Sequence, residues 1–219
     1  MGHVLYVINP NSSEAVTAGI DVAMAPLRSA DGPEIRCVTL ADGPPGVQTQ
    51  QHVDAAALSV LCFASAHRDG AAGFVTACFS DPGLHLLREM GQVPSFGISE
   101  CAALTALTMG QNFGVIAMLA GAIPRHWRTW GAMGITQRVA GEMPIGRTVS
   151  ELADRAATEQ AMVAAGKRLR DDKGAQVLVM GCAGMAAFRE VLQDATGLPV
   201  VEPTQAAVAM ALGRIRLGW

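Results

Sequence analysis

The chain has 219 residues, of which 50% are hydrophobic and 16% are charged, and its formal net charge is -3 at pH 7. Because so little charge accompanies so much apolar surface, we expect part of that surface to be buried between the subunits of a homo-oligomer. Scattered lysines and arginines argue against a nucleic-acid partner, and the longest apolar stretch, residues 113–124, is shorter than the roughly 20 residues of a membrane-spanning helix, so we expect no membrane partner.

Short β-branched runs alternate with alanine-rich stretches along the whole chain, a pattern typical of βαβ units around a parallel sheet. Strands are predicted at residues 3–8, 34–40, 73–78, 94–98, 113–118, 135–140, 175–180 and 199–202. Helices are predicted at residues 13–27, 50–69, 82–91, 100–110, 121–133, 150–172, 184–196 and 203–216. Serines at positions 12 or 13, 99 and 150 are expected to cap three of these helices.

The predicted elements divide into two similar halves. A strand opens each half, and the third strand of each half ends at a cysteine, Cys78 in the first and Cys182 in the second. This order predicts a pseudo-symmetric pair of lobes whose parallel sheets face one cleft. The loops at 42–46 and 141–146 occupy equivalent places and are expected to edge that cleft. No secretory signal precedes the first strand, so we expect a cytoplasmic protein.

The two strand-end cysteines are the best clue to function. A thiol at the carboxyl end of a parallel strand, just before a helix, lies where open α/β sheets bind ligands and where the helix dipole favours the thiolate. A racemase needs two groups of similar pKa on opposite faces of one carbon, and Cys78 and Cys182 meet that need. The alternative is that both are small core hydrophobes, the interpretation favoured for Cys37, Cys62 and Cys101.

A carbanion would also need donors that hold the carbonyl oxygen on which charge develops. We expect them among the backbone N–H groups of Phe79, Ser80, Ala183 and Gly184 and of the loop at 9–13, although that loop could be only a turn and helix cap.

The remaining motifs predict no metal, cofactor or nucleotide. The five cysteines are widely spaced without a CxxC pair, so neither a disulfide framework nor a zinc site is expected. The histidines lack metal spacing, and only His85 is expected to approach the site, whereas the aromatic stretch at 126–130 is expected to pack within a helix or at a subunit contact. Neither a dinucleotide fingerprint in the first βα turn nor a P-loop is present.

These segments resemble the hydantoin and allantoin racemase branch of the aspartate/glutamate racemase superfamily. The resemblance lies in INPNSS at 8–13, Gly43-Pro44 followed by Asp54, ACFSDPGL at 77–84, GCAGM at 181–185 and LPVVEP at 198–203. It implies an α/β fold of two pseudo-symmetric Rossmann-like lobes, each with a four-stranded parallel sheet flanked by helices, and an active-site cleft between them. It also implies that residues 1–98 plus 203–219 form the first lobe and residues 99–202 the second, because the C-terminal helix returns to the first.

The resemblance further implies cofactor-independent two-base catalysis and oligomeric assembly. Cys78 and Cys182 would be the acid/base pair, and substrate would be held by the side chains and amides of Asn11, Ser12, Phe79, Ser80, Ala183 and Gly184. The chain departs from the branch at Ala117-Met118-Leu119, where related hydantoin racemases carry threonines, at Cys101, a third thiol near the expected cleft, and at 121–130.

We therefore predict a racemase of 5-substituted hydantoins or a related cyclic ureide such as allantoin, with the two sulfurs roughly 7 Å apart. The substrate is a small molecule, hydantoin-like or carboxylate. Amino-acid racemisation of the aspartate/glutamate type and maleate-type cis/trans isomerisation are the alternatives, although we expect the pocket to lack the charged groups that a free amino acid requires. Arylmalonate-type decarboxylation needs only one such cysteine, so the presence of two argues against it. From a different class, the protein could be a non-catalytic binder of a small ligand.

Overall fold

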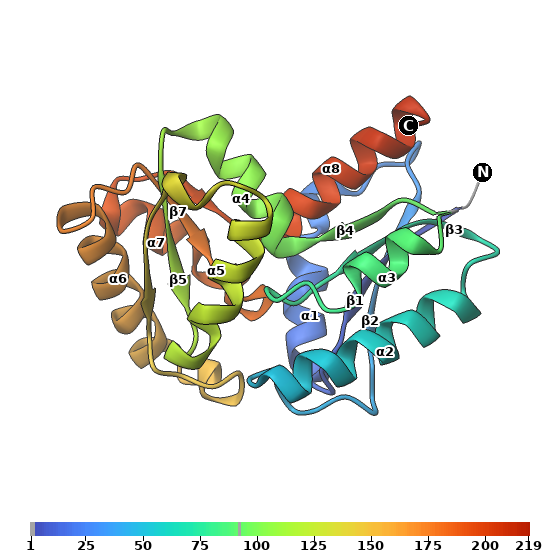
Figure 1. Ribbon diagram of the computed structural model, residues 1–219, viewed down its shortest axis with the longest axis horizontal. Coiled ribbons are helices and arrows are strands. Elements are labelled where there is room, and N and C mark those ends of the chain that lie inside the picture. Colours follow the sequence, from blue (N-terminus) through green and yellow to red (C-terminus); the bar gives the residue numbers. More distant parts are fainter. Residues whose placement is uncertain (1–2, 92) are drawn as a thin grey trace.

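Two four-stranded parallel sheets form the framework of the computed structural model, which describes residues 3–91 and 93–219 (Figure 1). The strands of the first sheet run in the order β2-β1-β3-β4 and those of the second in the order β6-β5-β7-β8, so the two halves have the same topology. This confirms the predicted α/β fold of two pseudo-symmetric lobes. The strands are β1 (Val4–Asn9), β2 (Glu34–Thr39), β3 (Ala71–Thr76), β4 (Ser95–Gly97), β5 (Phe113–Ala117), β6 (Val139–Pro144), β7 (Val177–Met180) and β8 (Val200–Val201).

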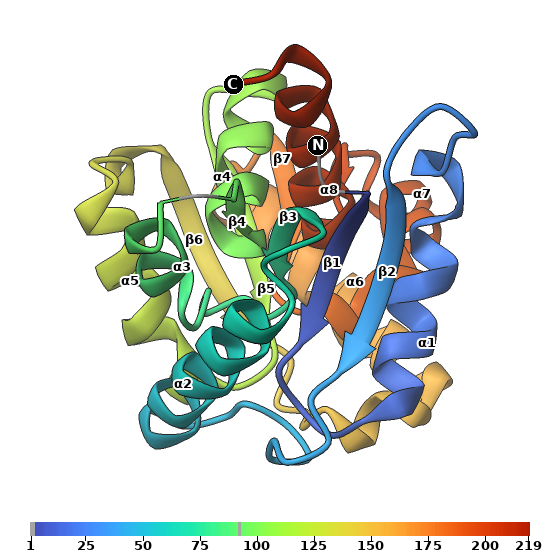
Figure 2. The same cartoon turned by 90° about the vertical axis from the view of Figure 1, so that its right-hand side faces the viewer.

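Helices cover both faces of each sheet, which explains why the strands read as continuous apolar runs. Along β1, Leu5 and Val7 face one core, and Tyr6 and Ile8 face another, as the two-residue period of a strand requires. Figure 2 shows the strands of the first sheet with helices on either side of them. The helices are α1 (Glu14–Ala23), α2 (Gln50–Ala66), α3 (Leu84–Glu89), α4 (Ile98–Met109), α5 (Ile123–Ala132), α6 (Arg155–Asp171), α7 (Arg189–Thr196) and α8 (Pro203–Leu217).

The C-terminal helix α8 packs on the first half of the molecule, although the chain reaches it from the second sheet. It contacts β3 and β4, and it also contacts α4, which in turn touches β4, β7 and β8 between the two sheets (Figure 1). We therefore propose that residues 203–219 belong with residues 1–98 in one lobe and that residues 99–202 form the other. Within the part of the chain that the structure describes, every helix is too short or too polar to span a bilayer.

The strand predicted at 135–140 and the loop predicted at 141–146 are wrong in their bounds. Residues 136–138 form a short 3-10 helix, and β6 runs from Val139 to Pro144, paired in parallel with β5. Gly141 and Pro144 suggested a loop, because both residues are uncommon inside strands. However, β6 is the edge strand of its sheet, where a terminal proline removes no hydrogen bond that the ladder needs.

One predicted helix cap is confirmed, and one helix start differs from the prediction. Ser13 caps α1, because its Oγ accepts a hydrogen bond from the N–H of Val16 (3.3 Å between Oγ and N). The helix predicted at 150–172 is divided instead: residues 150–153 form a 3-10 turn, and Asp154 caps α6. A carboxylate at this point accepts from the N–H of Ala157 and so ends the turn and starts the helix.

Candidate active site

Both strand-end cysteines line one cavity between the two halves. Cys78 follows the end of β3 by two residues, and Cys182 follows the end of β7 by two residues, and these strands hold equivalent positions in their sheets. The two side chains are partly exposed to this cavity. Cys101 lies instead in the buried core and is not part of the cavity wall, so the third thiol does not reach the site.

Seven of the eight predicted site residues line this cavity; they are Asn11, Cys78, Phe79, Ser80, Cys182, Ala183 and Gly184. Ser12 does not line it. Its backbone N–H donates to the carbonyl of Pro44 (3.0 Å between N and O), so it joins the first loop to the loop that follows β2. Met118 and Leu119 form part of the wall, as their place after the fifth strand predicts.

Hydrogen bonds within the first loop fix the orientation of Asn11. Asn9 is completely buried, and its Nδ2 donates to Oδ1 of Asn11 (3.1 Å) and to Oγ1 of Thr17 (3.0 Å). The N–H of Ser13 also donates to Oδ1 of Asn11 (2.9 Å). With its oxygen engaged in this way, Asn11 can offer its Nδ2 as a donor to a ligand.

The two thiols are held in their protonated form more strongly than the sequence suggested. Burial raises the pKa of Cys78 to about 12, and the nearby Cys182 raises it further, whereas the N–H of Ser80 lowers it. Burial likewise raises the pKa of Cys182 to about 11, against the effect of the Gly184 N–H, which donates to Sγ (3.4 Å between N and Sγ). The expectation that helix starts would favour the thiolates is therefore wrong, because one N–H group per sulfur does not offset desolvation.

A buried carboxylate ties the Cys78 loop to the helix between the sheets. The two carboxylate oxygens of Asp81 accept hydrogen bonds from the N–H groups of Ser99 and Glu100, each at 2.9 Å, at the start of α4. Gly97 leaves the space for this contact, since a Cβ there would lie 2.3 Å from Cγ of Asp81. Asp81 therefore performs the capping role predicted for Ser99, and burial raises its pKa to about 7.

A second buried carboxylate stands near Cys182. Glu202 is only 3% exposed and caps α8, where its two oxygens accept from the N–H groups of Thr204 (3.1 Å) and Gln205 (2.5 Å). Burial raises the pKa of Glu202 to about 7, and its charge raises the pKa of Cys182. Each thiol thus has a helix-capping carboxylate in its surroundings, which disfavours a thiolate there.

Sequence reasoning missed an imidazole at the cavity. His126 of α5 lines it and is 3% exposed, and its Nδ1 lies 2.5 Å from Oε1 of Glu142, whose side chain is completely buried in β6. The His126 ring also meets the ring of Phe79 edge to face, with 5.0 Å between the ring centroids. His85, the histidine expected near the site, is exposed and does not line the cavity.

Replacing Glu142 by alanine is expected to lower the free energy of unfolding by about 1 to 3 kcal/mol, because it leaves a buried imidazole without its hydrogen-bond partner. Urea unfolding of both proteins at neutral pH measures the change. Glu190→Ala is the matched control, since Glu190 is 86% exposed in its side chain and its loss should cost less than about 0.5 kcal/mol. Equal effects of the two substitutions would contradict the role of the buried pair.

The cavity also carries two positive charges, contrary to the expectation of a pocket short of charged groups. Arg125 of α5 and Arg147, which follows β6, both contribute to the wall.

Among the residues that the structure describes, no group of three or more histidine, cysteine or acidic side chains is arranged to hold a metal ion.

Comparisons with known proteins give a consistent result across the chain. Residues 5–211 match the family described as Asp/Glu/Hydantoin racemase. A hydantoin racemase of Rhizobium meliloti is 29% identical over 98% of this chain and 90% of its own length, and a hydantoin racemase of Paenarthrobacter aurescens is 30% identical over 98% and 92%.

Solved structures agree with these relatives. The allantoin racemase from Klebsiella pneumoniae is 32% identical, with a TM-score of 0.90 over 98% of this chain and 88% of its own. The allantoin racemase from Pseudomonas fluorescens is 30% identical, with a TM-score of 0.89 over 98% and 92%. A glutamate racemase from Francisella tularensis shares the fold, at 14% identity and a TM-score of 0.73. The family match at residues 5–211 includes both cysteine loops.

Proposed function

The chain belongs to the Asp/Glu/hydantoin racemase family and is an isomerase, and from that premise we propose that it racemises 5-substituted hydantoins or a related cyclic ureide such as allantoin. One observation carries the proposal: two thiols from equivalent strands of the two sheets line the same cavity. The hydantoin racemases and allantoin racemases among its relatives support the choice of a cyclic ureide.

In the proposed reaction, Cys78 and Cys182 stand on opposite faces of the stereogenic ring carbon, with their sulfurs roughly 7 Å apart. The thiolate of one removes the proton from this carbon, and the electron pair moves onto the adjacent carbonyl oxygen. The thiol of the other then donates its proton to the opposite face, and the electron pair returns to carbon. One proton leaves and one arrives, so the substrate is inverted and the two sulfurs have exchanged their protonation states.

The hydantoin ring suits this chemistry because its stereogenic carbon lies beside a carbonyl group. We assign the N–H groups of Phe79 and Ala183, together with Nδ2 of Asn11, to the oxygen that becomes negatively charged. The N–H groups of Ser80 and Gly184 face the sulfurs instead and stabilise whichever one is ionised. The apolar wall at Met118 and Leu119 would receive the uncharged part of the ring substituent.

Polarimetry of enantiopure substrates tests the proposal. We expect loss of optical rotation with 5-benzylhydantoin, 5-isopropylhydantoin or allantoin, and none with aspartate or glutamate. A variant lacking both cysteines is the blank for spontaneous racemisation. Activity on the amino acids alone would favour the amino-acid racemase, conversion of maleate to fumarate would favour the isomerase, and absence of any proton exchange would favour a non-catalytic binder.

A further inference from the structure

The charges around the cavity are unbalanced in favour of cations. Its wall, as far as the structure describes it, includes Arg125 and Arg147 but no aspartate or glutamate. The two cysteines add no negative charge near neutral pH, since burial raises both thiol pKa values to about 11 or above. A site with this balance favours an anionic ligand.

Among the described residues, Arg125 makes hydrogen bonds but no salt bridge. Its Nη1 donates to the carbonyl of Gly121 (3.0 Å) and its Nη2 to the carbonyl of Gln48 (3.1 Å), and its Nε is buried without a hydrogen-bond partner in the described residues. Neutral carbonyl oxygens orient the guanidinium but do not neutralise it. A partly buried cation left in this condition is costly, and an anion at the cavity would relieve the cost.

Arg147 differs from Arg125 in that an acidic group lies near it. Hydrogen bonds from Thr148 lower the pKa of Glu151, and the positive charge of Arg147 lowers it further. The Glu151 carboxylate therefore offsets part of the charge of Arg147. Among the described residues, Arg125 is therefore the main positive charge of the cavity that no acidic side chain offsets. Its charge also reaches Cys78, which places the guanidinium near one of the two proposed bases.

We propose that the physiological substrate is a cyclic ureide whose ring substituent carries a carboxylate, and that Arg125 binds this carboxylate while the stereogenic carbon lies between the thiols. This inference rests on the proposed function and deepens it by naming the substrate class. The position of Arg125 suits it to distinguish substrates with a carboxylate from those without one. Arg125 belongs to α5, and the Gln48 carbonyl that it contacts belongs to the segment before α2 on the other side of the cavity. The guanidinium is thus oriented by both halves before a ligand binds.

A competing use of Arg125 is to stabilise the Cys78 thiolate, with no anionic substrate at all. The two uses predict different substrate dependence. An arginine that serves the thiolate affects charged and neutral substrates alike, whereas an arginine that binds a substrate carboxylate affects only those that carry one.

Two hydantoins of equal size separate these uses: 5-(2-carboxyethyl)hydantoin and its amide, 5-(2-carbamoylethyl)hydantoin. With wild type we expect kcat/KM for the acid to exceed that for the amide by about tenfold or more, as a charge-assisted pair requires. In Arg125→Gln this ratio should fall to about one, mainly through loss on the acid, and Arg125→Lys should recover part of it. The matched control is Arg128→Gln, one turn further along α5, which keeps Arg125 and should therefore leave the ratio close to its wild-type value.

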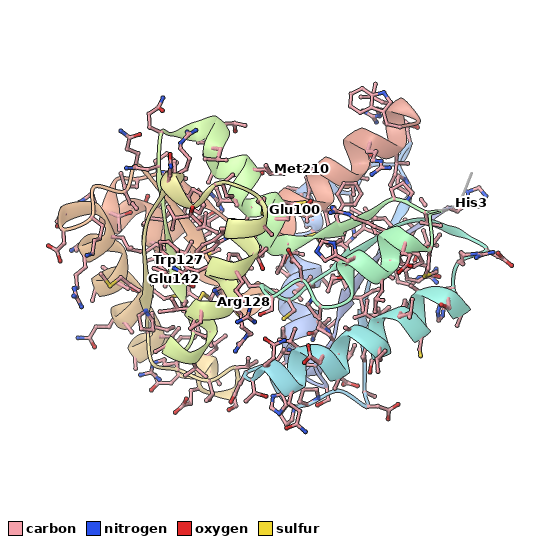
Figure 3. All side chains as sticks on the ribbon, viewed as in Figure 1. His3, Glu100, Trp127, Arg128, Glu142 and Met210 are labelled. Atoms are coloured by element: carbon pink, nitrogen blue, oxygen red, sulfur yellow. The ribbon has the colours of Figure 1, made fainter. Side chains whose placement is uncertain are left out.

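Arg128 suits this purpose because it carries the same charge outside the cavity. Its side chain extends toward the start of α2, where Nη2 donates to Oε1 of Gln50 (2.6 Å), and it does not line the cavity (Figure 3). Substituting it removes a charge whose field reaches Arg125, but it leaves Arg125 and both of its hydrogen bonds in place.

Equal kcat/KM for acid and amide in wild type would overturn the inference and leave the racemase proposal intact. A loss in Arg125→Gln that is the same for both substrates would assign Arg125 to the thiolate and also overturn it. Calorimetric titration of both compounds into the protein supplies the independent readout. If neither is racemised but the acid binds more tightly than the amide, and Arg125→Gln removes the difference, the anion site stands and the proposed function falls; if neither binds, both fall.

Discussion

Replacing Cys78 or Cys182 by serine is expected to lower hydantoin racemisation by about 10² to 10⁴-fold in each case, the usual contribution of a positioned acid or base. A hydroxyl is nearly the same size as a thiol but far less acidic, so it fills the space without exchanging protons. Both residues line the cavity and are partly exposed, and serine keeps nearly the same volume, so the fold should persist. Initial rates by polarimetry, with circular dichroism as the check on folding, measure the effect.

The control for this pair is Cys62→Ser, which removes an exposed thiol on α2 and should leave the rate unchanged. The two cysteine variants should also differ from each other. Each retains one thiol, and so each should exchange the proton of one enantiomer without inverting it, and the enantiomers should be opposite in the two variants. A rate within tenfold of wild type in either variant would exclude a paired mechanism.

The second large effect is expected from pH. Because the thiol pKa values are raised to about 12 for Cys78 and about 11 for Cys182, the form with one thiolate is rare at neutral pH and becomes more abundant as pH rises. We therefore expect kcat/KM to increase about tenfold per pH unit, or roughly a thousandfold from about pH 6 to pH 9. Initial rates corrected for spontaneous racemisation give the profile.

The direction of the profile follows from which form burial disfavours. Burial disfavours the charged thiolate, so the thiol persists to higher pH than an ordinary cysteine, and activity is lost as pH falls. A profile that levels off below about pH 8 would mean that a thiolate already exists in the free enzyme. That result would restore the expectation that the helix starts favour the thiolates.

The sequence predicted the fold and the meeting of Cys78 and Cys182 at one cavity, because both depend on local patterns. Alternating strands and helices identified the parallel sheets, and a cysteine just after a buried strand must lie at the carboxyl edge of its sheet. The bounds of β6 were not predictable in this way, because its pairing with β5, and not the preference of Gly141 or Pro144, makes it a strand.

The charged part of the site depends on contacts that no local pattern contains. His126 and Glu142 belong to a helix and a strand that meet only in the folded chain, and a buried glutamate in β6 reads from the sequence as a solvated loop residue. Arg125 likewise reads as an ordinary helix-surface arginine. Its place in the cavity follows from the packing of α5 opposite the segment before α2, as the hydrogen bond to the Gln48 carbonyl shows.

Deuterium labelling tests the central claim, that two thiols act on opposite faces of one carbon, most directly. One enantiomer of a hydantoin is incubated with wild-type protein in deuterium oxide, and both enantiomers are recovered early in the reaction for mass spectrometry. The account predicts deuterium in the inverted product and almost none in the remaining substrate, because the base that removes the proton differs from the acid that returns one. Equal labelling of substrate and product from the start would mean that a single base serves both faces, and would contradict it.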